Sequence, residues 1–225
     1  MDRNLIITGG AGNLGREVVG KFKREGYKII ATIAPESVDK IEEADDVYEI
    51  DVTDENSVKE FAKEYVLQYG EVESVALLVG GYKGGGIENT SNNLLTEMIK
   101  LNFLSAFNMV KNFLPIMKKA NKGSFLLVGA RPALQPEQGK SSVAYALSKS
   151  LVSNLADLIA QDVTGTTIRS HVFVPSIIDT PPNREAMAGQ DFSKWVSPAE
   201  IAEAMHYAAT NPSLRDMTFK LYGDV

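Results

Sequence analysis

The sequence predicts an α/β protein, a doubly wound parallel sheet of six to seven strands with helices on both faces. Short apolar runs alternate with segments of helical pattern along the chain, and strands that are apolar on both faces are typical of a parallel sheet covered on each side. The first apolar run is followed by a turn with glycines at positions 9, 10, 12 and 15 and then by a helical segment. Glycines there allow the close helix–strand packing of this architecture.

Six apolar runs are predicted strands, and a seventh run near the C-terminus is a candidate to close the sheet. They are Leu5–Thr8, Tyr27–Ile33, Val47–Ile50, Val75–Val79, Ser124–Val128 and Ile168–Val174, followed by Met217–Tyr222. No linker, repeat or low-complexity segment interrupts the chain, whose length suits one domain with a substantial core. We therefore expect a single domain over residues 1–225.

Capping residues, glycines and prolines predict the helices. The predicted helices run over about 13–25, 54–69, 91–119 and 198–210. A further predicted helix, before the last of these, carries Tyr145. Thr53 or Asp54 can cap the second helix, and a glycine follows each of the first two. Pro115 is expected to kink the third helix or end it early. Ser197-Pro-Ala-Glu200 is a capping box for the last helix, with proline at its first position.

The composition excludes several classes of protein. The net charge is −6, without a basic cluster, which argues against a nucleic-acid or anionic-membrane partner. The absence of cysteine excludes disulfides, iron–sulfur clusters and thiolate catalysis. Neither histidine has a partner at metal-ligand spacing, no apolar run approaches the roughly 20 residues of a membrane span, and the N-terminus lacks a signal-peptide pattern. We expect a cytoplasmic protein with a small-molecule substrate and no metal.

The glycine turn Gly9–Gly15 also suits a ligand. Its glycines permit a pyrophosphate to approach the start of the following helix, where free N–H groups and the helix dipole favour anions. A turn that only packs strand against helix is the alternative. A nucleoside-triphosphate loop is excluded, because Arg16-Glu17 stands where Lys-Ser/Thr is required. The position of the turn favours a dinucleotide.

Tyr145 and Lys149 are the candidate acid and base of the chain. Four residues along a helix bring both side chains onto one face, roughly 6 Å apart along the axis. An ammonium beside a phenol favours the phenolate, so Lys149 is expected to lower the pKa of Tyr145 from its usual value near 10. The product is a proton donor and acceptor usable near neutral pH.

With these motifs, the chain resembles the short-chain dehydrogenase/reductase family over essentially its whole length, and so a Rossmann-type fold. The resemblance implies that Asp51 contacts the adenine, that Asn102 organises a proton relay, and that Pro175…Thr180 lies at the nicotinamide. The catalytic residues that it implies are Tyr145, Lys149 and Asn102. The cofactor-binding residues are Gly9, Gly12, Asn13, Leu14, Gly15, Asp51, Val52, Gly80, Gly81, Lys149 and Thr180. It also implies a homodimer or homotetramer.

Two departures from the family pattern matter. Gly129-Ala130 stands where the family has a substrate-orienting Ser, so Ser141, Ser142 or water would replace that hydroxyl, although both serines also suit a helix cap. The end of the second strand has neither an acidic ribose ligand nor an arginine for a 2′-phosphate near Ile33. The cofactor is therefore NAD or NADP, with the preference open.

The expected function is hydride transfer from NAD(P)H to a small acceptor. The glycine turn, Gly80-Gly-Tyr82 and the segment from Asp179 to Trp195 resemble those of the family's pterin-reducing members. That resemblance implies a flat conjugated acceptor such as quinonoid dihydropterin, on which Tyr82 could stack. The alternatives are a reductase of simple carbonyls or alcohols, and a catalytically weak NAD(P)-binding sensor or scaffold.

Overall fold

The computed structural model describes residues 3–224. Within that range seven parallel strands form one sheet in the order β3-β2-β1-β4-β5-β6-β7. The strands are β1 Arg3–Thr8, β2 Tyr27–Ile33, β3 Asp46–Glu49, β4 Ser74–Leu77, β5 Ser124–Val128, β6 Arg169–Pro175 and β7 Thr218–Leu221. The strand order reverses between β1 and β4, and ligands of such sheets bind in the crevice beyond the strand ends at this point. The predicted doubly wound fold is confirmed.

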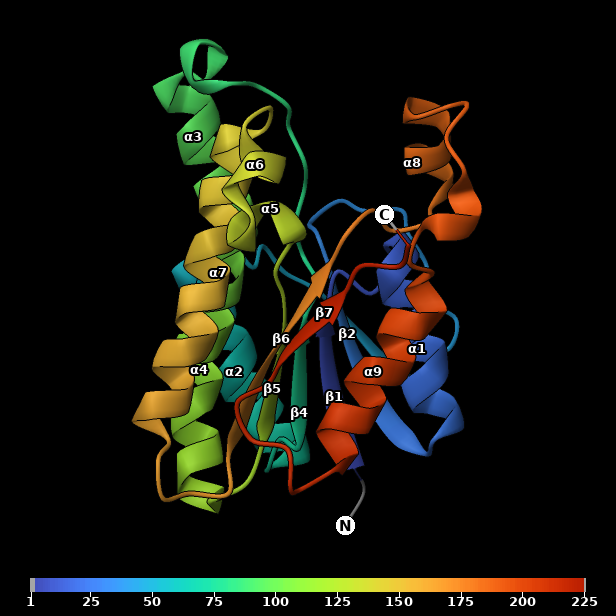
Figure 1. Cartoon of the computed structure of the whole chain (residues 1–225). Coiled ribbons are helices and arrows are strands. Elements are labelled where there is room, and N and C mark those ends of the chain that lie inside the picture. Colours follow the sequence, from blue (N-terminus) through green and yellow to red (C-terminus); the bar gives the residue numbers. More distant parts are fainter. Residues whose placement is uncertain (1–2, 225) are drawn as a thin grey trace.

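Helices cover both faces of the sheet (Figure 1). On one face α1 (Asn13–Arg24) packs beside α9 (Pro198–Thr210), and on the other lie α2 (Glu55–Tyr69), α4 (Ser105–Ala120) and α7 (Val143–Asp162). Each layer has its own core, one centred on Phe22 and Met205 and the other on Phe113 and Ile159. These two cores hold the carboxyl ends of the strands at one edge of the molecule.

Side chains cap two helices as expected, and a third cap, at Ser91, was not predicted. The Asp54 carboxylate accepts a hydrogen bond from the Ser57 amide at the start of α2. Ser197 and Glu200 form the predicted capping box at the start of α9. Ser91 caps α3 (Asn92–Ile99) by accepting from the Leu94 amide. Such caps satisfy N–H groups that have no partner within the helix.

The helix predicted over 91–119 is not a single regular helix. A π turn, Lys100–Leu104, separates α3 from α4. Pro115 does not end the helix early, because α4 continues through it to Ala120. π turns in helices are rare and frequently mark functional sites, and this one contains Asn102.

Short helices that the sequence did not predict surround the strand ends. They are α5 (Arg131–Leu134), α6 (Pro136–Gly139), α8 (Pro181–Ala186) and the 3-10 turns Ile87–Asn89 and Phe192–Lys194. Figure 1 shows α3, α5 and α6 rising above the strand ends on one side and α8 on the other. Between residues 3 and 224, no helix is long and apolar enough to cross a membrane.

Candidate active site

A cavity of about 320 Å³ lies at the strand ends, beside the glycine turn. We call it the strand-end cavity. It is lined by Gly9, Ala11, Gly12, Thr32, Ile33, Ala34, Ser37, Asp39, Ile50, Asp51, Val52, Thr53, Leu78, Val79, Gly80 and Leu101. Five of the predicted cofactor residues are among them. The carboxylate of Asp51 accepts hydrogen bonds from the Thr53 amide and hydroxyl, and the hydroxyl bond is the main cause of its lowered pKa.

The glycine turn has the backbone that a bound anion requires. Gly9 adopts a φ of +71°, and the Gly12 amide donates to the Gly9 carbonyl. Gly12 precedes α1 and no side chain caps that helix, so the first N–H groups of α1 stay available to a pyrophosphate. Asn13 and Leu14 are the first two residues of α1. The turn and cavity together therefore fit a dinucleotide.

Gly15 has a packing role rather than a place in the cavity wall. A Cβ atom at this position would overlap the Gly9 carbonyl oxygen and lie 2.7 Å from the Gly10 carbonyl carbon. Only glycine lets the first turn of α1 approach the backbone of Gly9 and Gly10 this closely. Gly15 therefore shapes the turn without touching the cavity.

The Asn102 side chain clamps the peptide backbone at Gly81. Its Oδ1 accepts from the Gly81 amide at 2.8 Å, and its Nδ2 donates to the Gly81 carbonyl at 3.1 Å. The same Nδ2 donates to the Ser148 hydroxyl at 2.9 Å, which in turn donates to the Tyr145 carbonyl. Asn102 thus joins the segment after β4 to the helix that carries the tyrosine–lysine pair. The sequence did not single out Ser148, although it directly precedes Lys149.

Lys149 lies behind the wall of the strand-end cavity. It is 6% exposed, and its Nζ donates to the Val128 carbonyl at 2.8 Å. A Cβ atom at Gly80 would lie 3.1 Å from that Nζ and 2.7 Å from Asn102 Oδ1. The absence of a side chain at Gly80 therefore brings the ammonium close to the cavity. Burial lowers the pKa of Lys149 to about 8.

The pKa of Tyr145 differs from the prediction. Burial, followed by the neighbouring Tyr82, raises it above its usual value, so the expectation that Lys149 lowers it is wrong for this structure. The Lys149 ammonium is held by the Val128 carbonyl, and desolvation of the phenol dominates. At neutral pH Tyr145 is protonated, which is the form of a proton donor.

The glycine loop, residues 80–86, is docked on the start of α7. The Gly85 amide donates to the Ser141 carbonyl at 2.7 Å, and the Val143 amide donates to the Gly85 carbonyl at 2.9 Å. Within this loop, Tyr82 is 63% exposed and contacts the Tyr145 ring edge to face. Ser142 is buried at the cap position of α7, but its side chain makes no capping bond. The loop therefore sets Tyr82 against Tyr145.

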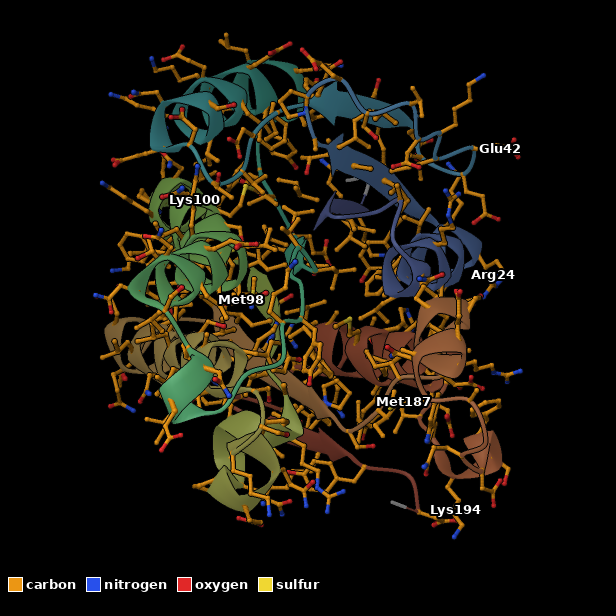
Figure 2. All side chains as sticks on the ribbon, turned by 90° about the horizontal axis from the view of Figure 1, so that it is seen from above. Arg24, Glu42, Met98, Lys100, Met187 and Lys194 are labelled. Atoms are coloured by element: carbon orange, nitrogen blue, oxygen red, sulfur yellow. The ribbon has the colours of Figure 1, made fainter. Side chains whose placement is uncertain are left out.

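The remaining predicted residues lie outside the strand-end cavity. Ala130 is 2% exposed directly after β5. Thr180 caps α8 by accepting from the Asn183 amide, in a segment where Arg184 pairs with Asp179. In the view from above, Met187 of this segment lies across the strand ends from Met98 of α3 (Figure 2).

The fold, the turn and the tyrosine–lysine pair define a class of proteins. The family described as short chain dehydrogenase matches residues 3–191, and the chain belongs to it. The chain is an NAD(P)-dependent oxidoreductase. The resemblance and the cofactor class inferred from the sequence are confirmed.

The chain is similar in sequence or in fold to several named proteins. The chain is 28% identical to dihydropteridine reductase of Dictyostelium discoideum over 220 residues, which cover 96% of this chain and 91% of that protein. It is 25% identical to a 3-oxoacyl-(acyl-carrier-protein) reductase of Thermotoga maritima over 224 residues, covering 92% and 90%. NADP-bound ElxO has the same fold, with a TM-score of 0.90 at 21% identity over 99% of this chain and 98% of that one. Ligand-free aldohexose dehydrogenase of Thermoplasma acidophilum has a TM-score of 0.86 at 24% identity, over 99% and 93%.

Proposed function

We propose that this oxidoreductase reduces a flat, conjugated acceptor such as a quinonoid dihydropterin. The observation that carries the proposal is the exposed Tyr82 ring in contact with Tyr145. An aromatic face beside the proton donor suits a planar heterocycle, because aromatic rings stack or meet edge to face with favourable energy. The 28% identity to a dihydropteridine reductase supports the same acceptor class.

In the proposed mechanism, a nicotinamide dinucleotide held at the glycine turn and the strand-end cavity would supply the hydride that reduces the acceptor. Tyr145 donates the accompanying proton from its hydroxyl, and its raised pKa keeps that hydroxyl protonated at neutral pH. Lys149 is mostly charged at neutral pH with a pKa of about 8, so its ammonium stabilises the phenolate left after proton transfer. Asn102 holds the Gly81 backbone and, through Ser148, the helix turn of Tyr145.

Ala130 is consistent with this acceptor. A simple ketone needs a hydroxyl to orient and polarise its carbonyl. A conjugated quinonoid ring is readily reduced, and contact of its planar face with an aromatic side chain is enough to orient it. Ala130 supplies no hydroxyl, and it is buried. The second candidate, reduction of simple carbonyls, is favoured by the buried Ser142 at the start of α7 and by the 25% identity to a 3-oxoacyl-(acyl-carrier-protein) reductase.

Kinetics with two acceptor classes test the proposal. The purified protein is titrated with NADH and NADPH, and turnover of quinonoid dihydropterin is compared with a panel of simple ketones and aldehydes. We expect the larger kcat/KM for the dihydropterin. A larger kcat/KM for ketones would replace the proposal with the carbonyl candidate, and dinucleotide binding without any turnover would favour a sensor.

We also propose that residues 1–225 act as one catalytic domain within a homodimer or homotetramer. Four apolar side chains on α4 and α7 are exposed: Phe107, Leu147, Leu151 and Leu158. An apolar stripe across two neighbouring helices suits a self-complementary contact. Light scattering should give a mass of at least two chains, and Leu158→Glu should reduce it; a monomer at all concentrations would contradict this.

A further inference from the structure

We propose that Asp39, held in place by Ser37, binds the adenosine ribose hydroxyls and makes the protein prefer NADH to NADPH. This rests on membership of the NAD(P)-dependent family and not on the identity of the acceptor. The predicted site contained neither residue, because both lie in an irregular segment after β2. Their position in the strand-end cavity is the first observation.

The second observation is the geometry of the pair. The Ser37 hydroxyl donates to Asp39 Oδ2 at 2.9 Å, and the Asp39 amide donates back to the Ser37 hydroxyl at 3.2 Å. The Ser37 amide donates to the Ala34 carbonyl at 3.1 Å. A carboxylate can accept about four hydrogen bonds, so the bond from Ser37 orients Asp39 and leaves capacity for two ribose hydroxyls.

The backbone of this segment is anchored to the sheet. Glu36 has a φ of +61°, which side chains rarely adopt, and its amide donates to the Glu49 carboxylate at 2.7 Å. Glu49 is the last residue of β3, paired with Ile33 of β2. The bond therefore fixes the bend that brings Ser37 and Asp39 back to the cavity.

The position of the pair matches the ribose end of a dinucleotide. In sheets of this kind the pyrophosphate lies at the glycine turn, and an acidic residue near the end of the second strand binds the ribose hydroxyls. The cavity is lined by the last two residues of β2, Thr32 and Ile33, and by Ala34 directly after the strand. None of these has a carboxylate. Asp39 is the cavity-lining carboxylate that follows β2, and Asp51 follows β3 and is bonded to Thr53.

The charges around the pair oppose a 2′-phosphate. That group carries a charge of about −1.5 to −2 at neutral pH, and it would face the Asp39 carboxylate. The Arg16 guanidinium donates to the Lys40 carbonyl. Arg16 and Lys40 line a neighbouring groove, which shares Asp39 with the strand-end cavity and also contains Glu42 and Glu43. The positive charge of the two basic side chains is therefore offset by three carboxylates in that groove.

Calorimetric titration of the acceptor-free protein tests the assignment. We expect wild-type protein to bind NADH at least about 10-fold more tightly than NADPH, since hydrogen bonds to a charged group contribute that much or more. Asp39→Asn should weaken the binding of NADH and strengthen the binding of NADPH. The ratio of the two dissociation constants should change by about 10-fold or more. The fragments 5′-AMP and 2′,5′-ADP should show the same change, because they contain only the adenosine end.

Two further variants distinguish a direct contact between Asp39 and the ribose from a general effect of negative charge in this segment. Glu42→Gln removes one negative charge from the same segment, but Glu42 lines the neighbouring groove alone, whereas Asp39 also lines the strand-end cavity. Glu42 lies at the outer edge of the view in Figure 2. We expect the ratio of the NADH and NADPH dissociation constants of this variant to stay within about twofold of the wild-type ratio. Ser37→Ala should reduce the NADH preference less than Asp39→Asn does, because it removes only the orienting bond.

Three outcomes would overturn the assignment. They are tighter binding of NADPH than NADH by the wild type, an unchanged ratio in Asp39→Asn, and an equal shift in Glu42→Gln. None of these measurements involves an acceptor. Failure of the dihydropterin proposal would therefore leave the coenzyme ratios unaffected, and the reverse also holds.

Discussion

The Tyr82 ring meets the Tyr145 ring edge to face, with the ring centroids 5.1 Å apart and the planes at 71°. Tyr82 comes from the glycine loop and Tyr145 from α7, and the hydrogen bonds between Gly85 and the start of α7 hold the two elements together. Under the proposed function, a planar acceptor beside the Tyr145 hydroxyl would meet the Tyr82 ring. The proposal therefore assigns selection of the acceptor to Tyr82.

Replacement of Tyr82 should affect the acceptor more than the cofactor. Tyr82→Ala is expected to lower kcat/KM for quinonoid dihydropterin by about 10-fold, the value of an aromatic contact of about 1.4 kcal/mol, with little change in the NADH dissociation constant. Tyr82→Phe, the matched control, keeps the ring and should retain most of the activity. Equal losses in both variants would assign the effect to the hydroxyl instead.

Loss of the Tyr145 hydroxyl should remove the proton donor. Tyr145→Phe keeps the ring against Tyr82, so packing is preserved, and kcat is expected to fall by about 10²–10⁴-fold. The dinucleotide affinity, measured by titration, should change little. A variant with wild-type turnover would show that another group donates the proton.

The glycine turn should tolerate one substitution and not another. Gly15→Val places a branched side chain against the Gly9 carbonyl and Gly10, so we expect a less stable fold and lost dinucleotide binding. At Gly12 the nearest atom to an added Cβ is the Gly9 carbonyl oxygen at 3.4 Å, so Gly12→Ala should fold normally and weaken binding only through contact with the ligand. Circular dichroism with titration separates the two effects; unimpaired nucleotide binding by folded Gly15→Val would move the pyrophosphate site elsewhere.

A hydroxyl at position 130 should not help a conjugated acceptor. Ala130→Ser restores the residue that the family has at this place, yet we expect unchanged turnover of quinonoid dihydropterin. The measurement is kcat/KM for dihydropterin and for simple ketones, side by side. A strong rise in dihydropterin turnover would contradict the proposed acceptor.

Acid should destabilise the fold through His171. This residue is fully buried on β6, and its Nε2 has no hydrogen-bond partner among the described residues. Burial lowers the pKa of His171 to about 4. Between about pH 6.5 and pH 4 the unfolded chain binds the proton and the folded chain does not, so stability falls as pH falls, by about 3 kcal/mol at most.

Urea unfolding of wild type and His171→Gln at pH 7.5, 5.5 and 4.5 checks this. Gln does not titrate, so the variant should lose less stability on acidification, and the difference between the two proteins should grow as the pH decreases. Parallel losses would show that other groups cause the acid sensitivity.

The fold was predictable because each strand is a local apolar run. All seven predicted strands are present, most shifted by one or two residues, and the capping box at Ser197 and the cap at Asp54 follow from neighbours within one helical turn. No local pattern marks the π turn, and the contact made by its Asn102 is long-range. Asn102 bonds to Gly81, 21 positions earlier in the chain.

Part of the site follows from the glycine turn and from the family resemblance. Gly9, Gly12, Asp51, Val52 and Gly80, which were predicted to bind the cofactor, line the strand-end cavity. The pKa of Tyr145 was not predictable, because it depends on desolvation and on which oxygen holds the Lys149 ammonium. Ser37 and Asp39 were also not predictable, since polar residues after a strand are ordinary until a bend returns them to the cavity.

The π turn has a consequence for insertions and deletions. Its hydrogen bonds span one residue more than those of an α-helix, so deletion of one residue from Lys100–Leu104 would restore a regular helix with little rotation of the part beyond it. The stripe of Met109, Phe113 and Met117, now wholly buried, would stay in the core, while Asn102 would lose its position beside the glycine loop. A one-residue deletion at the start of α4 would have the opposite effect, because an α-helix rotates by about 100° per residue and the stripe would turn out of the core. A change of length within the π turn would therefore damage the candidate site and spare the core.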